Sequence, residues 1–322
     1  MQIIINTYGA YLRKKDNCFL IKVEDQSQEI SVKKVDSILI TTGALISTDA
    51  LQMAIENNID VVFLNKFGEP FGRLWHSKLG STTLIRRRQL EASCSEAGLT
   101  MLLDWVNQRL DNQIAFLKKL KDKRPDNDTL LPAVERIQGY GAKLIELSGT
   151  IDDQRGTIQG LEGNCSKTYF EALSSIMPDK YKFHGRSRMP ALDEFNAMIN
   201  YGYGVLYSKV EKACLIAGLD PYLGFLHTDN YNKKSLVFDL IEMYRDLVDQ
   251  TVVYLFTGKK IKDSLFDKHT SGYTLNKEGK AVLLSALNET FDTTVRYKNR
   301  NIKNIDKIQH DCHSIAQELL KE

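Results

Sequence analysis

The stretch DVVFLNKFGEPFGRLW, residues 60–75, decides the fold class because it closes the part of the chain that is rich in β-branched residues. Its first six residues form a short apolar run that is typical of a strand. The remaining ten predict a hairpin with Gly68 and Pro70 in the turn, since both residues favour turn conformations. One short helix is expected upstream, over about 47–57. Four similar strand-like runs come before it: QIIINTY (2–8), CFLIKVE (18–24), EISV (29–32) and SILITT (37–42).

After Gly80 the chain changes to long stretches in which apolar residues recur with the period of a helix. Helices are predicted over roughly 84–121, 129–149, 165–176, 192–217, 235–257, 276–290 and 301–321. The sequence therefore predicts an α+β protein, in which a small N-terminal mainly-β domain (1–80) precedes a larger all-α domain (81–322). The segment SKLGSTT (77–83) is expected to join the two.

The composition is that of an ordinary soluble globular protein, with 43% hydrophobic and 26% charged residues in 322. No run of about 18 apolar residues is present, so no membrane span is predicted. The N-terminus lacks the features of a signal peptide, and the five cysteines are scattered without a CxxC pair. These features favour the reducing cytoplasm. A net charge of +2 is too small to indicate a nucleic-acid binder by itself.

Familiar catalytic motifs are missing from the sequence. It contains no Walker A loop, GxSxG, HExxH or Rossmann fingerprint, which excludes most nucleotide-cofactor and acyl-transfer chemistry. The segment HDCH (310–313) looks like a metal motif. However, Cys312 belongs to the apolar stripe of the predicted terminal helix, whereas His310 and His313 fall away from it. We therefore expect no metal there.

Two isolated residues could carry chemistry, although each also has a simpler explanation. Glu162 lies between two glycines in GLEGNCSKTYFEAL (160–173), just before a predicted helix, where a carboxylate interacts favourably with the helix dipole. His227 ends the segment GLDPYLGFLH (218–227). A lone histidine in such a place is more often a hydrogen-bonded structural residue than a ligand. The residues alone favour the structural explanation for both.

The segment SLVFDLIEMYR (235–245) carries a paired acidic edge on an otherwise apolar helix. Asp239 and Glu242 are three residues apart, so they share one face of that helix. A solvated acidic face is the simplest explanation. In the first two turns, however, Leu236, Phe238 and Met243 flank the acids, which predicts a recessed position. Two adjacent carboxylates in a recess repel each other and need a cation.

A basic and aromatic loop, DKYKFHGRSRMP (179–190), is the remaining candidate. Lys182, Arg186 and Arg188 lie close together in it, and such loops suit phosphate backbones. An ordinary solvated loop is an equally good interpretation. Two other basic segments, RRR (86–88) and RYKNRNIK (296–303), either extend the same track or belong to the surface.

The order and spacing of several segments resemble a known family. In the β part these are GAYLRKKDNCFLIK (9–22) and ILITTGALISTDALQMAIENNIDVVFLNKFGEPFGRL (38–74). In the helical part they are EGNCSKTYF (162–170), RMPALDEFNAMINYGYGVLYSKV (188–210), GLDPYLGFLH (218–227) and SLVFDLIEMYR (235–245). Together they are similar to the CRISPR-associated integrase family, the larger of the two core spacer-acquisition proteins. The resemblance covers nearly the whole chain.

The resemblance implies a metal site made of a glutamate, a histidine and a later acid on a helix, which fall on Glu162, His227 and Glu242. Asp239 matches an accompanying acid one turn earlier, and Arg245 matches an arginine that usually follows. The chain departs from the family at Asp246, where a proline is common, and at Met189-Pro190, where a Pro-Pro pair is common. These departures affect local loop shape and leave the implied ligands unchanged.

The implied chemistry is divalent-metal catalysis on DNA. Two carboxylates and one imidazole suit Mg²⁺ or Mn²⁺, and such an ion polarises a phosphodiester. In the family, the 3′-hydroxyl of a captured DNA fragment attacks the repeat backbone, and with water as nucleophile the same site is an endonuclease. Lys182, Arg186 and Arg188 would hold phosphates near the metal, and Asp239 would support the ligands.

The resemblance also implies partners: double-stranded and branched DNA, a second copy of the chain bound through the β domain, and a small ferredoxin-like CRISPR-associated protein. No membrane partner is expected. Two alternatives stay open. One is a non-catalytic DNA-binding scaffold with the same fold. The other is a small-molecule phosphodiesterase, which the missing nucleotide-recognition motif and the several basic patches disfavour.

Overall fold

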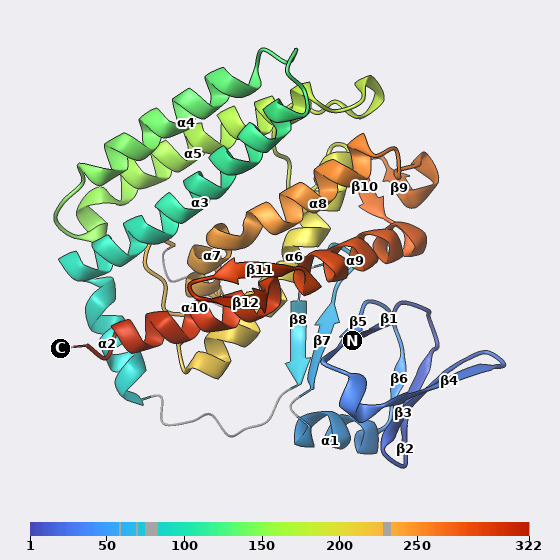
Figure 1. Ribbon diagram of the computed structural model, residues 1–322. Coiled ribbons are helices and arrows are strands. Elements are labelled where there is room, and N and C mark those ends of the chain that lie inside the picture. The colour runs from blue at the N-terminus through green and yellow to red at the C-terminus, as the bar shows by residue number, and fades with distance from the viewer. Residues whose placement is uncertain (58, 69, 75–82, 228–232, 322) are drawn as a thin grey trace.

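Figure 1 shows the computed structural model, in which a smaller N-terminal part built from β-sheets adjoins a larger, mostly helical part. The structure describes residues 1–57, 59–68, 70–74, 83–227 and 233–321. The expected joining segment (77–83) lies outside these residues except for Thr83, which begins a helix. The predicted α+β class is confirmed.

Two four-stranded sheets form the N-terminal part. In spatial order the first contains β1 (Gln2–Ile5), β5 (Ser37–Ile40), β7 (Asp60–Leu64) and β8 (Pro70–Leu74). The second contains β4 (Gln26–Ser31), β3 (Cys18–Val23), β2 (Tyr11–Lys15) and β6 (Leu45–Ile46). Strands β2 and β6 were not predicted, because β2 is mostly charged and exposed and β6 has only two residues.

Strand β5 explains why the first sheet has such an apolar sequence. Ile38 and Ile40 belong to the core of the N-terminal part, whereas Leu39 packs in the larger core of the helical part. Successive side chains point to opposite faces of a strand, so a sheet covered on both faces needs an uninterrupted apolar run. The predicted hairpin is confirmed, since β7 and β8 pair antiparallel, but Pro70 begins β8 and pairs with Leu64, so its expected place in the turn is wrong. Gly68 lies between them with φ of 86°, and a Cβ there would lie 2.8 Å from the ring of Tyr201.

One short helix, α1 (Thr48–Glu56), belongs to the N-terminal part as predicted, and the Ser47 hydroxyl caps it by accepting from the Ala50 backbone N–H at 3.3 Å. The helices that follow are α2 (Thr83–Ser93), α3 (Glu96–Asp122), α4 (Leu130–Ile145), α5 (Ile151–Ser175), α6 (Glu194–Ala217), α7 (Ser235–Ile241), α8 (Arg245–Thr257), α9 (Lys277–Asp292) and α10 (Asn304–Glu318).

The structure corrects three predictions about the helical part. The helix expected over 84–121 is two helices, because the Ser95 hydroxyl accepts from the Gly98 backbone N–H and starts α3 afresh. Helix α5 begins at Ile151, well before the predicted start at residue 165. The part is also not all-α. It contains two hairpins, formed by β9 (Phe266–His269) with β10 (Gly272–Leu275) and by β11 (Thr294–Tyr297) with β12 (Arg300–Lys303).

Helix α6 lies at the centre of the molecule, in contact with β8 on one side and with α8 and α10 on others (Figure 1). An ion-pair network joins it to the sheet. Arg73 of β8 lies 3.2 Å from an oxygen of Asp60 and 3.7 Å from an oxygen of Glu211 on α6. The helical part is therefore fixed to the first sheet by charge as well as by apolar packing. Among the described residues, no helix is both long and apolar enough to cross a membrane.

Candidate functional site

Three helical segments bring two glutamates to the same guanidinium group. Glu162 lies on α5, Glu242 lies in the single 3₁₀ turn Glu242–Tyr244 between α7 and α8, and Arg109 lies on α3. One nitrogen of Arg109, Nη1, is 3.0 Å from Glu162 Oε1 and 2.9 Å from Glu242 Oε2. Two carboxylates that are far apart in the sequence therefore meet at one point in the structure.

Burial makes this meeting point electrostatically strong. The side chains of Arg109, Glu162 and Glu242 are 7%, 14% and 10% exposed. Burial raises the pKa of Glu162 above its ordinary value, and the charge of Arg109 offsets this only in part. Burial acts in the same direction on Glu242, but Arg109 and Arg245 together hold the pKa of Glu242 below its ordinary value. The two carboxylates raise the pKa of Arg109, which is therefore fully charged.

The helix expected over 235–257 is interrupted where it carries Glu242. Helix α7 ends at Ile241, the 3₁₀ turn follows, and α8 begins at Arg245. The predicted recess is confirmed, because Asp239 and Glu242 are only 4% and 8% exposed. Asp249 of α8 is also buried, at 1% exposed. The acidic edge is thus enclosed by protein, and the alternative of a solvated face is wrong.

His227 and Asp239 form a hydrogen-bonded pair beside the glutamates. Asp239 Oδ1 lies 2.7 Å from His227 Nδ1 and accepts from the His227 backbone N–H at 3.1 Å. Its other oxygen, Oδ2, accepts from the Phe225 backbone N–H at 2.6 Å. A carboxylate at Nδ1 places the imidazole proton there, which leaves Nε2 as the acceptor or ligand atom. His227 also lies near enough to both glutamates to lower their pKa values.

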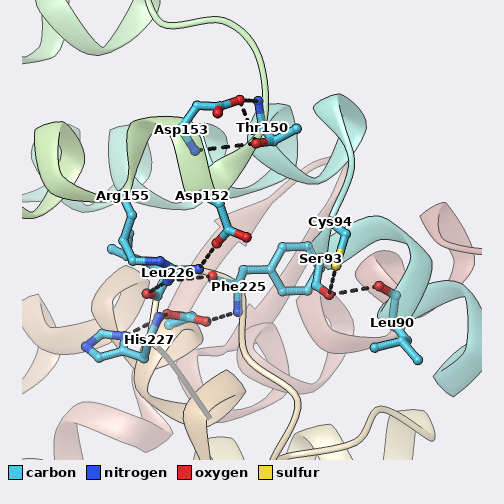
Figure 2. A network of polar contacts seen from close by, with 11 residues as sticks. Leu90, Ser93, Cys94, Thr150, Asp152, Asp153, Arg155, Phe225, Leu226 and His227 are labelled. Atoms are coloured by element: carbon cyan, nitrogen blue, oxygen red, sulfur yellow. Dashed lines mark hydrogen bonds and ion pairs between the residues drawn. The ribbon is translucent and has the colours of Figure 1, made fainter.

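Helix α5 holds the loop that carries His227. Figure 2 shows Arg155 of α5 reaching the backbone of this loop, where its guanidinium donates to the carbonyl oxygens of Phe225, at 3.1 Å, and Leu226. Arg155 also pairs with Asp152 of its own helix at 2.7 Å. The same helix therefore presents Glu162 and fixes the loop that ends at His227.

The position of Glu162 differs from the prediction. It lies inside α5 and not in a turn before a helix, so an interaction with a helix N-terminus does not explain it. Gly160 and Gly163 flank it as the sequence indicates. Apart from the adjoining backbone of α5 itself and the two residues next to each glycine, no described atom lies within 4 Å of where a Cβ would stand on either glycine. These glycines therefore leave open space on the helix surface next to Glu162.

Arg109 was missed by the sequence analysis, although a signal for it exists. It lies on the apolar stripe of α3 that includes Leu102, Val106 and Phe116. A lone arginine on such a stripe must either disrupt the core or have buried acidic partners, since a charge is almost never buried alone.

The three predicted ligands fit a divalent ion in chemistry, although not as a preformed cage. Within the described residues, no three His, Cys, Asp or Glu side chains are gathered closely enough to hold a metal by themselves. Instead Arg109 Nη1 lies between Glu162 and Glu242. Glu242 Oε2 is buried and accepts no well-oriented hydrogen bond from the described residues, and Arg109 Nη1, 2.9 Å away, is the cation that it now faces. Two carboxylates and an imidazole whose Nδ1 is already engaged form a donor set that suits Mg²⁺ or Mn²⁺.

The three basic residues predicted to bind DNA have different surroundings. Lys182 is exposed and pairs with Asp179 at 2.7 Å. Arg186 donates to the side-chain oxygens of Asn196 and Asn200, and its guanidinium also stacks on aromatic rings. Arg188 is exposed. Arg186 thus has a structural role in addition to any role with DNA.

A cavity of about 510 Å³ adjoins these residues and is lined from both parts of the chain. Its cationic lining residues are Lys66, Arg186, Arg188, Lys233, Lys234 and Arg245. Arg245 connects the cavity to the glutamates, because its Nη2 lies 2.8 Å from Glu242 Oε1 and its guanidinium lies over the ring of Tyr203 at 4.6 Å. A strongly basic, partly aromatic hollow therefore opens beside the acidic pair.

The family can now be assigned. Residues 3–289 match the family model described as CRISPR associated protein Cas1. The chain belongs to the Cas1 family. A relative from Archaeoglobus fulgidus, named CRISPR-associated endonuclease Cas1 1, is 34% identical over 94% of this chain and 91% of its own. Another, CRISPR-associated endonuclease Cas1 2 from Saccharolobus solfataricus, is 32% identical over 84% of this chain and 81% of its own.

Solved structures share the fold of this Cas1-family chain. A casposase bound to integration product superposes with a TM-score of 0.86 at 22% identity, covering 100% of this chain and 91% of that one. A CAS1 protein from Thermotoga maritima superposes with a TM-score of 0.84 at 24% identity, covering 100% and 98%. A chain of a Cas6-RT-Cas1–Cas2 complex superposes with a TM-score of 0.80 at 19% identity, covering 99% of this chain and 35% of its own.

Proposed function

We propose that this protein is a divalent-metal-dependent DNA endonuclease and strand transferase of CRISPR adaptation. In this function it inserts captured DNA fragments into a repeat array. The observation that carries the proposal is the meeting of Glu162 and Glu242 at one buried point, beside a histidine oriented by Asp239. Membership in the Cas1 family, whose relatives are named endonucleases, supports it.

In this proposal Glu162, Glu242 and Nε2 of His227 hold Mg²⁺ or Mn²⁺. The ion supplies Lewis-acid polarisation of the phosphodiester and stabilises its developing negative charge. The chain's own groups do the rest. Asp239 keeps the imidazole in the tautomer that exposes Nε2. Arg188 and Arg245, which line the adjoining basic cavity, bind phosphate oxygens and orient the DNA backbone, and exposed Lys182 extends this surface.

The proposal includes partners. Double-stranded and branched DNA are the substrates, a function that the basic cavity supports. Residues 1–80 form the domain through which two copies associate, and residues 81–322 form the catalytic domain. A small ferredoxin-like CRISPR-associated protein completes the assembly, which is supported by the solved complex that contains Cas1 and Cas2. The protein acts in the cytoplasm and needs no membrane.

One observation favours a second function, that of a non-catalytic DNA-binding scaffold. Arg109 and Arg245 together already neutralise the two glutamates, so the pair is balanced in charge without a metal. In a scaffold this arrangement would be purely structural, and the basic cavity would bind DNA without turnover. The two functions differ in whether the glutamates are needed for catalysis.

The deciding experiment measures strand transfer on branched DNA in Mn²⁺. We expect Glu242→Ala to abolish it. Because this change leaves two buried arginines with fewer partners, the isosteric Glu242→Gln is tested in parallel, and circular dichroism confirms folding. Glu171→Ala, an exposed glutamate on α5, is the matched control and retains full activity. Transfer at the wild-type rate by a folded Glu242 variant would falsify the site, and wild-type protein that binds DNA without turnover in any divalent ion would favour the scaffold.

A further inference from the structure

Arg109 has no part in the metal chemistry described above, yet it is the group that both glutamates contact. Its Nη1 atom bridges the two carboxylates, and its Nη2 atom donates to the Ser166 hydroxyl at 2.7 Å. Ser166 lies one turn of α5 beyond Glu162. The guanidinium therefore retains a hydrogen-bond partner on α5 that does not depend on either glutamate.

The charges around the site already balance without a metal. Glu162 and Glu242 contribute two negative charges, and Arg109 and Arg245, each within 3.0 Å of a glutamate oxygen, contribute two positive charges. Asp239 is engaged with His227 and two backbone N–H groups. A divalent ion that entered alone would leave these four side chains with two excess positive charges, of which the carboxylate of Asp239 offsets one. Because the site is nearly closed to solvent, such an excess is poorly screened.

A phosphodiester offers the missing negative charge. Each DNA phosphate that enters beside Arg245 lowers the positive excess by one, and the basic cavity opens at that residue. Metal and phosphate should therefore favour each other's binding. Linkage requires this effect to be reciprocal, so that whatever DNA adds to the affinity for metal, metal adds to the affinity for DNA.

We propose that Arg109 is a resident counter-cation that holds Glu162 and Glu242 together in the metal-free protein and makes metal binding depend on DNA. The inference rests on the proposed function, because it assumes that the two glutamates are metal ligands. A metal bound by Glu162 and Glu242 would compete with Arg109 Nη1 for these carboxylates, whereas Nη2 would keep its contact with Ser166. Arg109 is a positioning residue, since it acts on the ligands and not on the substrate.

The test is a titration of the full-length protein with Mn²⁺, followed by electron paramagnetic resonance of the free ion. It is run with and without branched DNA whose strands end in 3′-dideoxynucleotides, which cannot act as nucleophiles. We expect wild-type protein to bind Mn²⁺ about tenfold more tightly when the DNA is present. A Mn²⁺ affinity that is the same with and without DNA overturns the proposal, and this arm needs no variant.

Variants then assign the effect to Arg109. Arg109→Gln removes the resident charge, so we expect it to bind Mn²⁺ without DNA about tenfold more tightly than wild type and to gain less from DNA. Arg109→Lys keeps the charge and should stay near wild type. Arg136→Gln, an exposed arginine on α4, controls for the loss of a positive charge elsewhere. Wild-type or weaker Mn²⁺ binding by folded Arg109→Gln without DNA overturns the proposal.

The same titration separates this inference from the proposed function. If Glu242→Gln loses Mn²⁺ binding while Arg109→Gln binds like wild type, the glutamates are ligands and only the role of Arg109 is wrong. If Glu242→Gln binds Mn²⁺ like wild type, the metal site itself is wrong and both conclusions fail.

Discussion

Replacing Asp239 with asparagine tests how the loop that ends at His227 is held. The Asp239 side chain is completely buried and serves three donors: the backbone N–H groups of Phe225 and His227, and Nδ1 of His227. Asparagine has almost the same shape but only one oxygen. If that oxygen takes the place of Oδ1, the new amide group faces the Phe225 N–H, which is also a donor. If the amide is reversed, both His227 contacts are lost instead.

The smaller loss is therefore one hydrogen bond to a charged acceptor, worth about 1.5–3 kcal/mol, so we expect Asp239→Asn to lower the free energy of unfolding by about 2 kcal/mol. Because the imidazole is less firmly oriented, Mn²⁺ affinity should fall by about 10–100-fold. Urea unfolding gives the first quantity and a Mn²⁺ titration the second. Asp111→Asn, an exposed aspartate on α3, is the control. A variant within about 0.5 kcal/mol of wild type, the usual range for surface substitutions, would refute the reasoning.

Two further predictions concern helix packing and pH. Gly202→Ala should lower the free energy of unfolding by about 1–3 kcal/mol, because the new Cβ would lie 2.5 Å from Val248 Cγ1. Gly156→Ala is the control: outside the adjoining helix backbone no described atom lies within 4 Å of its Cβ, so it should raise the free energy of unfolding by about 0.5–1 kcal/mol. Equal effects of the two changes in urea unfolding would contradict the packing of α6 on α8. Burial raises the pKa of Asp249 to about 7, and the hydrogen bond from Tyr203 offsets part of this rise. The folded protein therefore binds a proton at Asp249 more tightly than the unfolded chain does, so protonation of Asp249 stabilises the fold. That contribution is complete below about pH 4 and is lost as pH rises through about 7, so urea unfolding of wild type should show a pH-dependent fall that is smaller in Asp249→Asn.

The sequence predicted elements best where local pattern and final packing agree. The run at 37–40 reads as a strand because both of its faces are buried, and the hairpin at β7–β8 was predicted from its turn residues. Helix α5 shows the opposite case. Gly156, Gly160 and Gly163 disfavour helix locally, so its first half was missed. Its tertiary contacts decide the conformation, since Ile158 and other residues of its buried face pack in the main core.

The residue patterns by themselves indicated the candidate site only as separate residues. The family resemblance grouped Glu162, His227 and Glu242 into one site, because nothing in a linear pattern states which distant side chains will face each other. Arg109 shows this limit most clearly, because its role depends on partners from two other helical segments. The break after Ile241, which sets the direction of Glu242, likewise depends on packing around the 3₁₀ turn.

The sheet that faces two cores has a practical consequence for anyone who wishes to divide the chain. Leu39 and Val62 complete the core of the helical part, and Arg73 pairs with Glu211 across the same junction. The helical part expressed alone would therefore expose apolar surface, and buried Glu211 would keep Lys234 but lose Arg73 as a partner. We expect two fragments cut within residues 75–82 to assemble when produced together, in the manner of split-protein complementation, and the helical fragment to aggregate when produced by itself.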